Sequence, residues 1–182
     1  MKINFIFLFI FLFALSGCKS TSSKSAKIQN QAQSVSSSGT LVIKPIVFKK
    51  GIHVRESVKN ECDLTGKLAT YIKKNSSRQF TKIITESNSV PAKAQVLSIV
   101  IEQVQGSGGG AWSGAKMVLI KGKLTRRGKL IGGFRASRYS GGGMWGAYKG
   151  TCNILGRCVK VLGKDVSKWL ANPTHNALLG NA

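Results

Sequence analysis

Acidic residues are scarce in this chain: 6 Asp and Glu face 28 Lys and Arg, and the formal net charge is +22. The few carboxylates are scattered, and neither His53 nor His175 stands beside a serine or cysteine motif. Catalysis by paired carboxylates or by an activated nucleophile therefore lacks its residues, and the sequence predicts a protein that is not an enzyme. The same shortage leaves most cations without an acidic partner, which favours binding to an anion.

Metal and nucleotide motifs are also missing. The four cysteines include no Cys-x-x-Cys pair and both histidines are isolated, which argues against zinc. Two glycine-rich stretches, 106–112 and 141–145, contain neither a Gly-Lys-Ser/Thr sequence nor GxGxxG. They are interpreted either as plain loops or as loops whose tryptophans, Trp112 and Trp145, anchor a ligand. We expect no cofactor and no metal.

Long apolar runs are absent apart from residues 3–15, which follow Lys2. This run is shorter than the about 20 residues that span a bilayer, and it has the pattern of a secretory signal peptide. It ends in Leu-Ser-Gly-Cys at 15–18, which resembles the lipobox of bacterial lipoproteins. That resemblance implies that residues 1–17 are removed and that the thiol of Cys18 is acylated, with palmitate among the expected chains.

The residue after this cysteine is Lys19 and not Asp. In lipoproteins of this kind, that implies sorting to the outer membrane of a Gram-negative bacterium, facing the periplasm. An exported protein meets phospholipids, glycolipids and acidic envelope polymers before it meets nucleic acid. We therefore expect the membrane (through the Cys18 lipid) and an anionic envelope lipid or an envelope protein complex as partners, and no nucleic acid. The sequence does not indicate an oligomeric state.

Composition divides the remaining chain into three parts. Residues 18–39 are rich in Ser and Lys and poor in large apolar side chains, which predicts a lipidated N-terminus and a flexible tether. Residues 40–172 are long enough for a single domain with its own core. Residues 173–182 are expected to be a C-terminal tail.

Alternating and β-branched stretches predict strands, and 3.6-residue periodicity predicts two helices. The expected strands are 41–48, 80–85, 94–104, 116–125 and 129–139, with a loop at 49–59. Pro45 indicates an edge strand or a bulge.

The first helix is expected to start at Asn60 as N-cap, with Asp63 returning a bond, and the second to start at Thr151 and stop at Asn172. The apolar stripe of the second helix comprises Leu155, Cys158, Val159, Leu162, Val166, Trp169 and Leu170, with Lys160, Lys164 and Lys168 on another face.

Three cysteines are left for an oxidising compartment: Cys62, Cys152 and Cys158. One disulfide and one remaining thiol are expected. Cys152 and Cys158 belong to one helix and point in different directions, so Cys62 must be one partner. Cys152 is narrowly preferred as the other, because it stands at the helix start and shares the direction of Leu155. Cys158 is the alternative.

The two strands at 116–125 and 129–139 flank Arg126-Arg127-Gly128, which has the composition of a tight hairpin turn. The alternation predicts that Val118, Ile120, Leu124, Leu130, Phe134 and Ala136 point inward. The cations expected to form a basic surface are Lys121, Lys123 and Arg135 on the strands, Arg126, Arg127 and Lys129 at the tip, and Arg138. Such a surface is either a solvated face that discourages edge pairing or a binding face for an anion.

The order strand, helix, several strands, helix over residues 41–171 resembles small outer-membrane lipoproteins of the YajG and LptE kind, together with the lipobox and the glycine-rich approach to the last helix. The fold expected is α+β, with a mostly antiparallel sheet of about four or five strands and two helices packed on one face. The leading hypothesis is a non-enzymatic, lipid-anchored protein that binds an anionic glycolipid or phospholipid through the basic face. The alternative is an accessory subunit of an envelope transport or secretion complex, acting by protein–protein docking.

Overall fold

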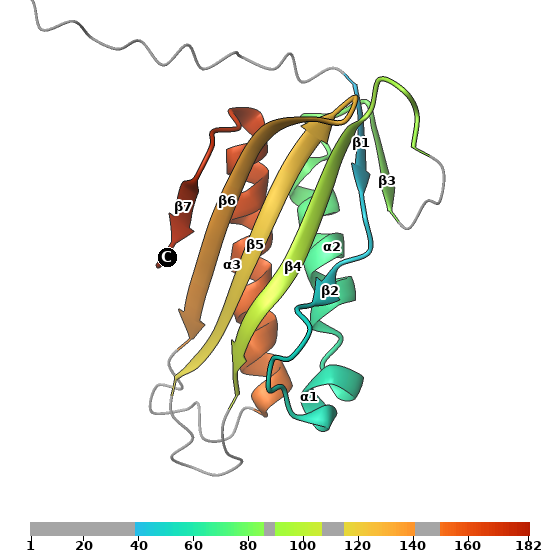
Figure 1. The fold of residues 1–182 in the computed structure, drawn as a ribbon. Coiled ribbons are helices and arrows are strands. Elements are labelled where there is room, and N and C mark those ends of the chain that lie inside the picture. The colour runs from blue at the N-terminus through green and yellow to red at the C-terminus, as the bar shows by residue number, and fades with distance from the viewer. Residues whose placement is uncertain (1–38, 86–89, 107–114, 141–149) are drawn as a thin grey trace, which may run out of the picture. The chain divides into compact units, whose positions relative to one another are not determined.

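Three long strands with alternating apolar residues form the centre of the sheet. They are β4 (Gln95–Gln105), β5 (Lys116–Arg126) and β6 (Lys129–Ser140), each antiparallel to the next. Inward side chains such as Ile99, Ile120 and Phe134 are buried. The computed structural model describes residues 39–85, 90–106, 115–140 and 150–182, and Figure 1 shows how their elements are arranged.

Short strands extend this centre on both sides. β1 (Thr40–Ile43) pairs in parallel with β3 (Lys82–Thr85) and with β4, β2 (Val47–Phe48) pairs in parallel with β4, and β7 (Ala177–Gly180) pairs in parallel with β6. The sheet is therefore mixed and has seven strands, in the order β3-β1-β4-β5-β6-β7 with β2 beside β4, where about four or five mostly antiparallel strands were expected. Pro45, which cannot donate to a ladder, lies in the break between β1 and β2.

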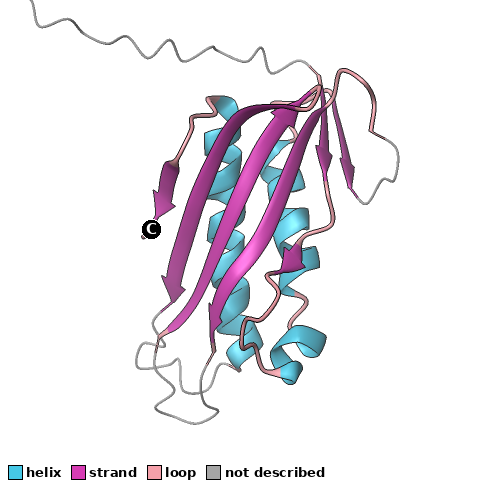
Figure 2. Cartoon of the chain, viewed as in Figure 1, coloured by secondary structure: helices cyan, strands magenta, loops and turns pink. Residues whose placement is uncertain are grey.

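Two long helices, α2 (Leu64–Ser76) and α3 (Thr151–Ala171), cover one face of the sheet, behind it in Figure 2. Their apolar stripes meet the inward side chains of the strands in one core. The α+β class and the packing of two helices on one face are confirmed. The expected stripe of α3 is buried, whereas Lys160, Lys164 and Lys168 are exposed. Among the described residues, none of the helices has both the length and the apolar character needed to cross a bilayer.

The helix starts differ from the expectation. A short helix, α1 (Glu56–Glu61), occupies part of the expected loop 49–59 and runs through Asn60, so Asn60 cannot be the cap of α2. The N-cap is Asp63, which has a positive φ of 43° and accepts a hydrogen bond from the Gly66 amide at 3.1 Å. Helix α3 begins at Thr151, but its N-cap is Gly150 and makes no side-chain capping bond.

The direction of Leu130 also differs from the expectation. The register of β5 and β6 shifts between Leu124, which pairs with Gly132, and Thr125, which pairs with Leu130. The extra residue on β6 reverses the alternation towards the turn, as a β-bulge does. Leu130 is therefore 50% exposed and not in the core, while Val118, Ile120, Leu124, Phe134 and Ala136 are buried as expected.

One disulfide ties the two helical segments together. Cys62, at the end of α1, is bonded to Cys152 in the first turn of α3, which is the pairing preferred from the sequence, with Cα atoms 4.8 Å apart. Cys158 remains a buried thiol that donates a weak hydrogen bond to the Lys116 carbonyl oxygen at 3.7 Å. Burial raises the pKa of the Cys158 thiol to about 11, so it stays protonated at neutral pH and acts as a packing residue.

Candidate functional site

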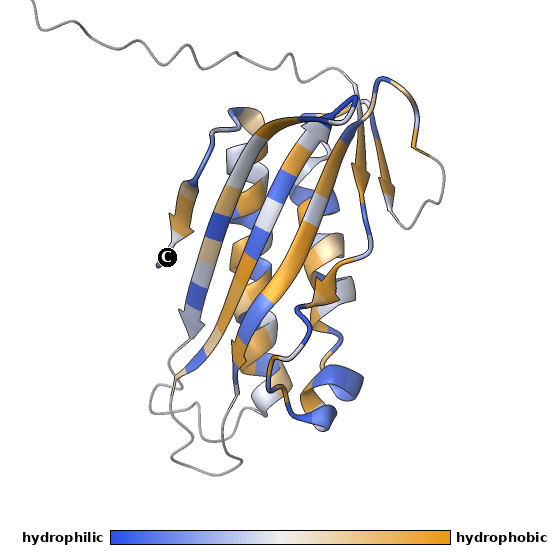
Figure 3. Ribbon diagram, viewed as in Figure 1, coloured by the Kyte–Doolittle hydropathy of each residue, from blue (hydrophilic) through white to orange (hydrophobic). Residues whose placement is uncertain are grey.

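The face of the sheet turned away from α2 and α3 carries most of the predicted basic residues. We define the open sheet face by the outward side chains of β4–β7. It includes Val100, Gln103, Leu119, Lys121, Lys123, Leu130, Arg135, Tyr139 and Leu178. Lys121, Lys123 and Arg135 are exposed on it because they alternate with buried Ile120, Leu124 and Ala136. Figure 3 shows these strands with hydrophilic bands beside apolar stretches.

The hairpin tip adds three more cations at one end of this face. Arg127 and Gly128 form the turn with φ angles of 50° and 76°, both positive, as a two-residue hairpin turn with the twist of the strands requires. Arg126 and Lys129 pair across its base. Arg127 and Lys129 are exposed and Arg126 is half-buried, so the tip presents positive charge to solvent.

Arg138 does not belong to the open sheet face. It pairs with Val118, whose side chain is buried, and so it points to the side covered by the helices. Its guanidinium donates to both carboxylate oxygens of Asp165 on α3, at 2.7 and 2.9 Å. These hydrogen bonds raise the pKa of Arg138 above its ordinary value. The prediction that Arg138 is part of the basic surface is wrong. The strand alternation points its side chain towards the helices, where it pairs with the Asp165 carboxylate.

Arg135 has an acidic neighbour on the open sheet face. Its guanidinium reaches across β5 and lies 2.9 Å from a carboxylate oxygen of Glu102 on β4. The Arg135 side chain is 56% exposed and that of Glu102 is 13% exposed. Glu102 stands where β4 bulges between Ile101 and Gln103, which gives it its place on this face. Water partly screens this ion pair. The carboxylate of Glu102 therefore offsets part of the positive potential of Arg135, but it holds the arginine side chain in place only weakly.

A groove runs between β5, β6 and β7 on this face. Its volume is about 350 Å³, and it is lined by the cations Lys121, Lys123 and Arg135, by His175, and by apolar groups that include Leu130 and Leu178. We name it the basic groove. Cations and large apolar side chains thus surround one concavity, which suits a ligand that has both a negative and an apolar part.

A second groove adjoins the basic groove and shares Arg135 and Leu178 with it. Its volume is about 390 Å³, and its further lining includes Met117, Leu119 and Tyr139. Gln103, Gln105, Ser137 and Asn181 add polar groups to its wall, which holds no cation besides the shared Arg135. We name it the distal groove, because it lies on the side away from the hairpin tip. Together the two grooves follow β6 and β7 from the side of the hairpin tip towards the opposite end of β5.

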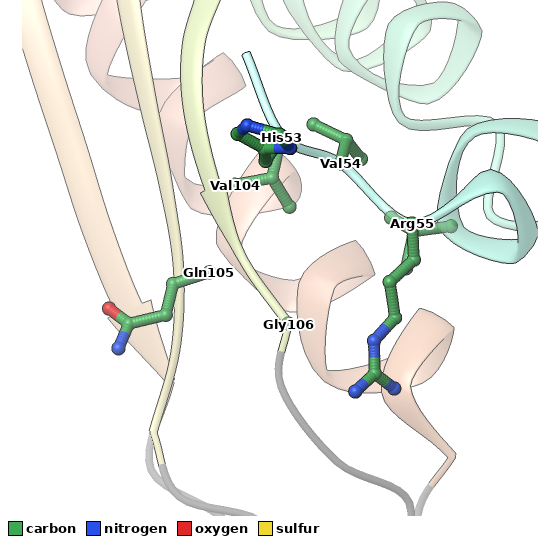
Figure 4. A pocket seen from close by; sticks show the side chains of 7 residues that line it. His53, Val54, Arg55, Val104, Gln105 and Gly106 are labelled. Atoms are coloured by element: carbon green, nitrogen blue, oxygen red, sulfur yellow. The ribbon is translucent and has the colours of Figure 1, made fainter.

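A third cavity, of about 230 Å³, lies on the other side of β4 beside His53, Arg55 and Gln105. In Figure 4 the Arg55 guanidinium extends away from the His53 ring, and the Gln105 amide lies across the strand from Arg55. The polar groups do not converge on one point. Lys116 does not line this cavity; burial and the nearby charge of Arg55 lower the pKa of its amino group. This cavity is therefore a weaker candidate than the open sheet face.

The structure brings the predicted Lys121, Lys123 and Arg135 together in one groove, and other predicted site residues lie elsewhere. Cys18, Trp112 and Trp145 lie outside the described residues. His175 and Leu178 were missed, because residues 173–182 were interpreted as a tail. The apolar run Ala-Leu-Leu just after Asn176 is the only signal of β7, and it is shorter than an ordinary strand. Within the described ranges, His, Cys, Asp and Glu form no group that could hold a metal ion.

No protein-family model and no curated protein sequence matches the chain. Several solved structures are similar to the chain. One, an uncharacterized protein, has a TM-score of 0.54 at 10% identity, with 72% of this chain and 92% of that chain covered. Another is a DUF330 protein from Xanthomonas campestris (TM-score 0.49, 10% identity, 74% and 84% covered). A third is the lipoprotein GNA1162 from Neisseria meningitidis, with a TM-score of 0.42 at 16% identity and with 71% of this chain and 99% of that chain covered. At these identities the similarity concerns the fold alone.

Proposed function

We propose that this protein is a non-enzymatic, lipid-anchored envelope protein that binds an anionic envelope lipid through the open sheet face. The observation that carries the proposal is the group of four exposed cations on the hairpin, beside Arg135 and Arg138, which pair with Glu102 and Asp165. Residues 116–140 contain no Asp or Glu, and Lys121, Lys123, Arg127 and Lys129 are all exposed. Like charges on one surface repel one another, and an anionic ligand relieves that repulsion.

The proposed anchor and address come from the N-terminal sequence. Residues 1–17 would be the signal peptide, Cys18 the acylated residue, and 18–39 the tether of the domain. Lys19 supports sorting to the outer membrane with the domain facing the periplasm. The order of elements and the lipobox-like residues 15–18 support the proposed relation to YajG-like and LptE-like lipoproteins. The tether gives the domain reach towards a lipid headgroup.

Charge reversal tests the proposal. The mature lipidated protein is reconstituted in phosphatidylcholine vesicles, and capture of a second vesicle population containing phosphatidylglycerol is measured by co-flotation. The variant Lys121→Glu/Lys123→Glu/Arg127→Glu is expected to lower capture at least about tenfold, because each basic residue near an anionic surface contributes about 1 kcal/mol. The loss is expected to shrink as salt rises.

The matched control is Lys160→Glu/Lys164→Glu/Lys168→Glu on α3. It changes the net charge by the same amount, but its residues are exposed on the helix layer and not on the open sheet face. We expect this control to keep most of the capture. Equal losses in the two triple variants would mean that net charge, and not the open sheet face, governs binding.

The Glu102–Arg135 pair makes a prediction of the opposite sign. Glu102→Gln removes the negative charge that lies 2.9 Å from Arg135, so capture of phosphatidylglycerol vesicles is expected to rise severalfold. The free energy of unfolding should change by less than about 1 kcal/mol, because the arginine is largely exposed. Capture that falls in this variant would show that the carboxylate supports the ligand site.

Exposed apolar residues favour a second candidate function, docking to a protein complex of a transport or secretion system. Tyr139 on β6 and Leu178 on β7 are exposed. Strand β7 is an edge strand, and its outer backbone groups face no further strand in the described sheet. Affinity capture from native envelopes after cross-linking tests it. A reproducible partner whose recovery is lost with Leu178→Glu, but kept in the hairpin charge-reversal variant, would favour this function over lipid binding.

A further inference from the structure

We propose that the open sheet face seats one acyl chain of its anionic lipid: the phosphate lies in the basic groove and the chain runs over Leu178 onto the apolar side chains of the distal groove. This inference rests on the proposed function and names the ligand class more narrowly, as a glycerophospholipid bound as a single molecule. A face that only attracted a polyanion would need the cations alone.

The polar end of the seat is built from three segments. Lys121 and Lys123 come from β5, Arg135 from β6, and His175 from the turn before β7, and all four line the basic groove. Two lysines and one arginine from two strands therefore line one concavity, and their charge-assisted hydrogen bonds suit a phosphate group. The volume of about 350 Å³ is near the lower end of the range for small-molecule sites, about 300–1,000 Å³. It therefore suits one headgroup with the start of one chain.

The apolar end is made by side chains that the fold itself leaves in water. Leu178 is 69% exposed and Leu130 is 50% exposed, although both stand among cations. Leu178 and Arg135 are partners in the register of β6 and β7, so an apolar and a charged group share one place on the face. Both leucines line the basic groove, so each can contact an apolar part of a ligand held there.

Leu178 and Arg135 are also the residues that the two grooves share. A chain whose phosphate is held by the cations can therefore pass Leu178 directly into the distal groove. There Met117, Leu119 and Tyr139 offer apolar contact beside the polar Gln103, Gln105, Ser137 and Asn181. Each methylene buried in this way adds to the affinity, which gives the seat a dependence on chain length that a flat charged face would not have.

Gly133 gives the seat a floor that can be filled. It lines the basic groove, and a Cβ placed on it would meet only the Gly122 carbonyl oxygen, at 3.5 Å, which is an ordinary contact. A Cβ is therefore accommodated at this position, and the atoms of a larger side chain would extend from it into the groove that Gly133 lines. Gly133→Leu therefore blocks the seat and leaves the net charge unchanged.

The test uses the full lipidated protein in a neutral detergent, with lysophosphatidylglycerol bearing a fluorescent acyl chain as the probe. The wild-type protein is expected to bind this probe at least about tenfold more tightly than glycerophosphoglycerol, the headgroup alone. Gly133→Leu is expected to lower the affinity for the probe about tenfold. The control Gly156→Leu adds the same side chain to α3, where a Cβ meets nothing within 4 Å, and should bind as wild type.

The outcomes separate the two proposals. If Gly133→Leu binds the probe as wild type, or if the headgroup alone binds as tightly as the probe, the seat is overturned while capture of anionic vesicles still supports the proposed function. If the wild-type protein neither binds the probe nor captures anionic vesicles, both fail. Thermal unfolding of both glycine variants shows that the fold is kept.

Discussion

Replacing the disulfide by Cys62→Ala/Cys152→Ala is expected to lower the free energy of unfolding by about 4–5 kcal/mol. The two cysteines are 90 residues apart in the sequence, so the bond closes a loop that contains α2 and the three long strands. Cross-linking so long a loop removes much entropy from the unfolded chain. Urea unfolding followed by circular dichroism, with and without the bond, measures the difference.

Cys158→Ala is the matched control, because it removes the other cysteine of α3 and leaves the disulfide intact. We expect it to cost about 1 kcal/mol, as ordinary core substitutions do. Adding a reductant to the wild-type protein should reproduce the loss seen in the double variant. A non-reducing peptide map that joins Cys62 to Cys158 would contradict the assignment on which this prediction rests.

The disulfide shows how far the sequence can lead. Helical phase excluded a bond between Cys152 and Cys158, because the two side chains point in different directions from one helix. It could not decide which of them meets Cys62, since that depends on where α1 lies. The structure places Cys158 in the buried stripe that faces the sheet, beside Lys116 of β5, whereas Cys152 is at the helix start next to α1.

The central strands and both long helices were predictable because their periodic patterns are long. Of the outer strands, β1, β2 and β3 overlap the expected strands 41–48 and 80–85. Strand β7 was interpreted as part of a tail, because its four residues are too few for a periodic signal. The parallel pairings of the outer strands join segments far apart in the chain, and no local pattern specifies such contacts. The same limit hid α1, whose six residues include only one buried side chain, Val58.

The candidate site was predictable as far as simple alternation holds. Lys121, Lys123 and Arg135 were placed outward by counting in twos. The count failed at Leu130, where a β-bulge inserts a residue. At Arg138 the prediction did not follow the alternation, which starts from Ala136 and places this side chain inward. There it pairs with Asp165. The apolar half of the site includes Leu178 of β7. The sequence did not predict this strand, so it could not show that an exposed leucine lies beside the cations of β5 and β6.

Gly163→Ala is expected to lower the free energy of unfolding by about 1–3 kcal/mol, although alanine is the better helix former. A Cβ at this position would lie 2.5 Å from the Tyr71 Cβ, 3.1 Å from the Tyr71 carbonyl carbon and 3.2 Å from the Ile72 amide nitrogen. Two of these three atoms are backbone of α2, so no rotamer change can make room. Helices α2 and α3 must move apart, and the core between them loosens.

Gly156→Ala provides the matched control, since it is the same chemical change in the same helix. A Cβ at Gly156 would meet nothing within 4 Å, so only the gain in helix propensity remains, and we expect stabilisation by about 0.5–1 kcal/mol. The two glycines should therefore respond with opposite signs in one urea unfolding experiment. Stabilisation of both variants would mean that α2 and α3 do not touch at Gly163. Because the inward face of β5 and β6 packs on these helices, that result would also undermine the division of the sheet into a buried face and an open sheet face.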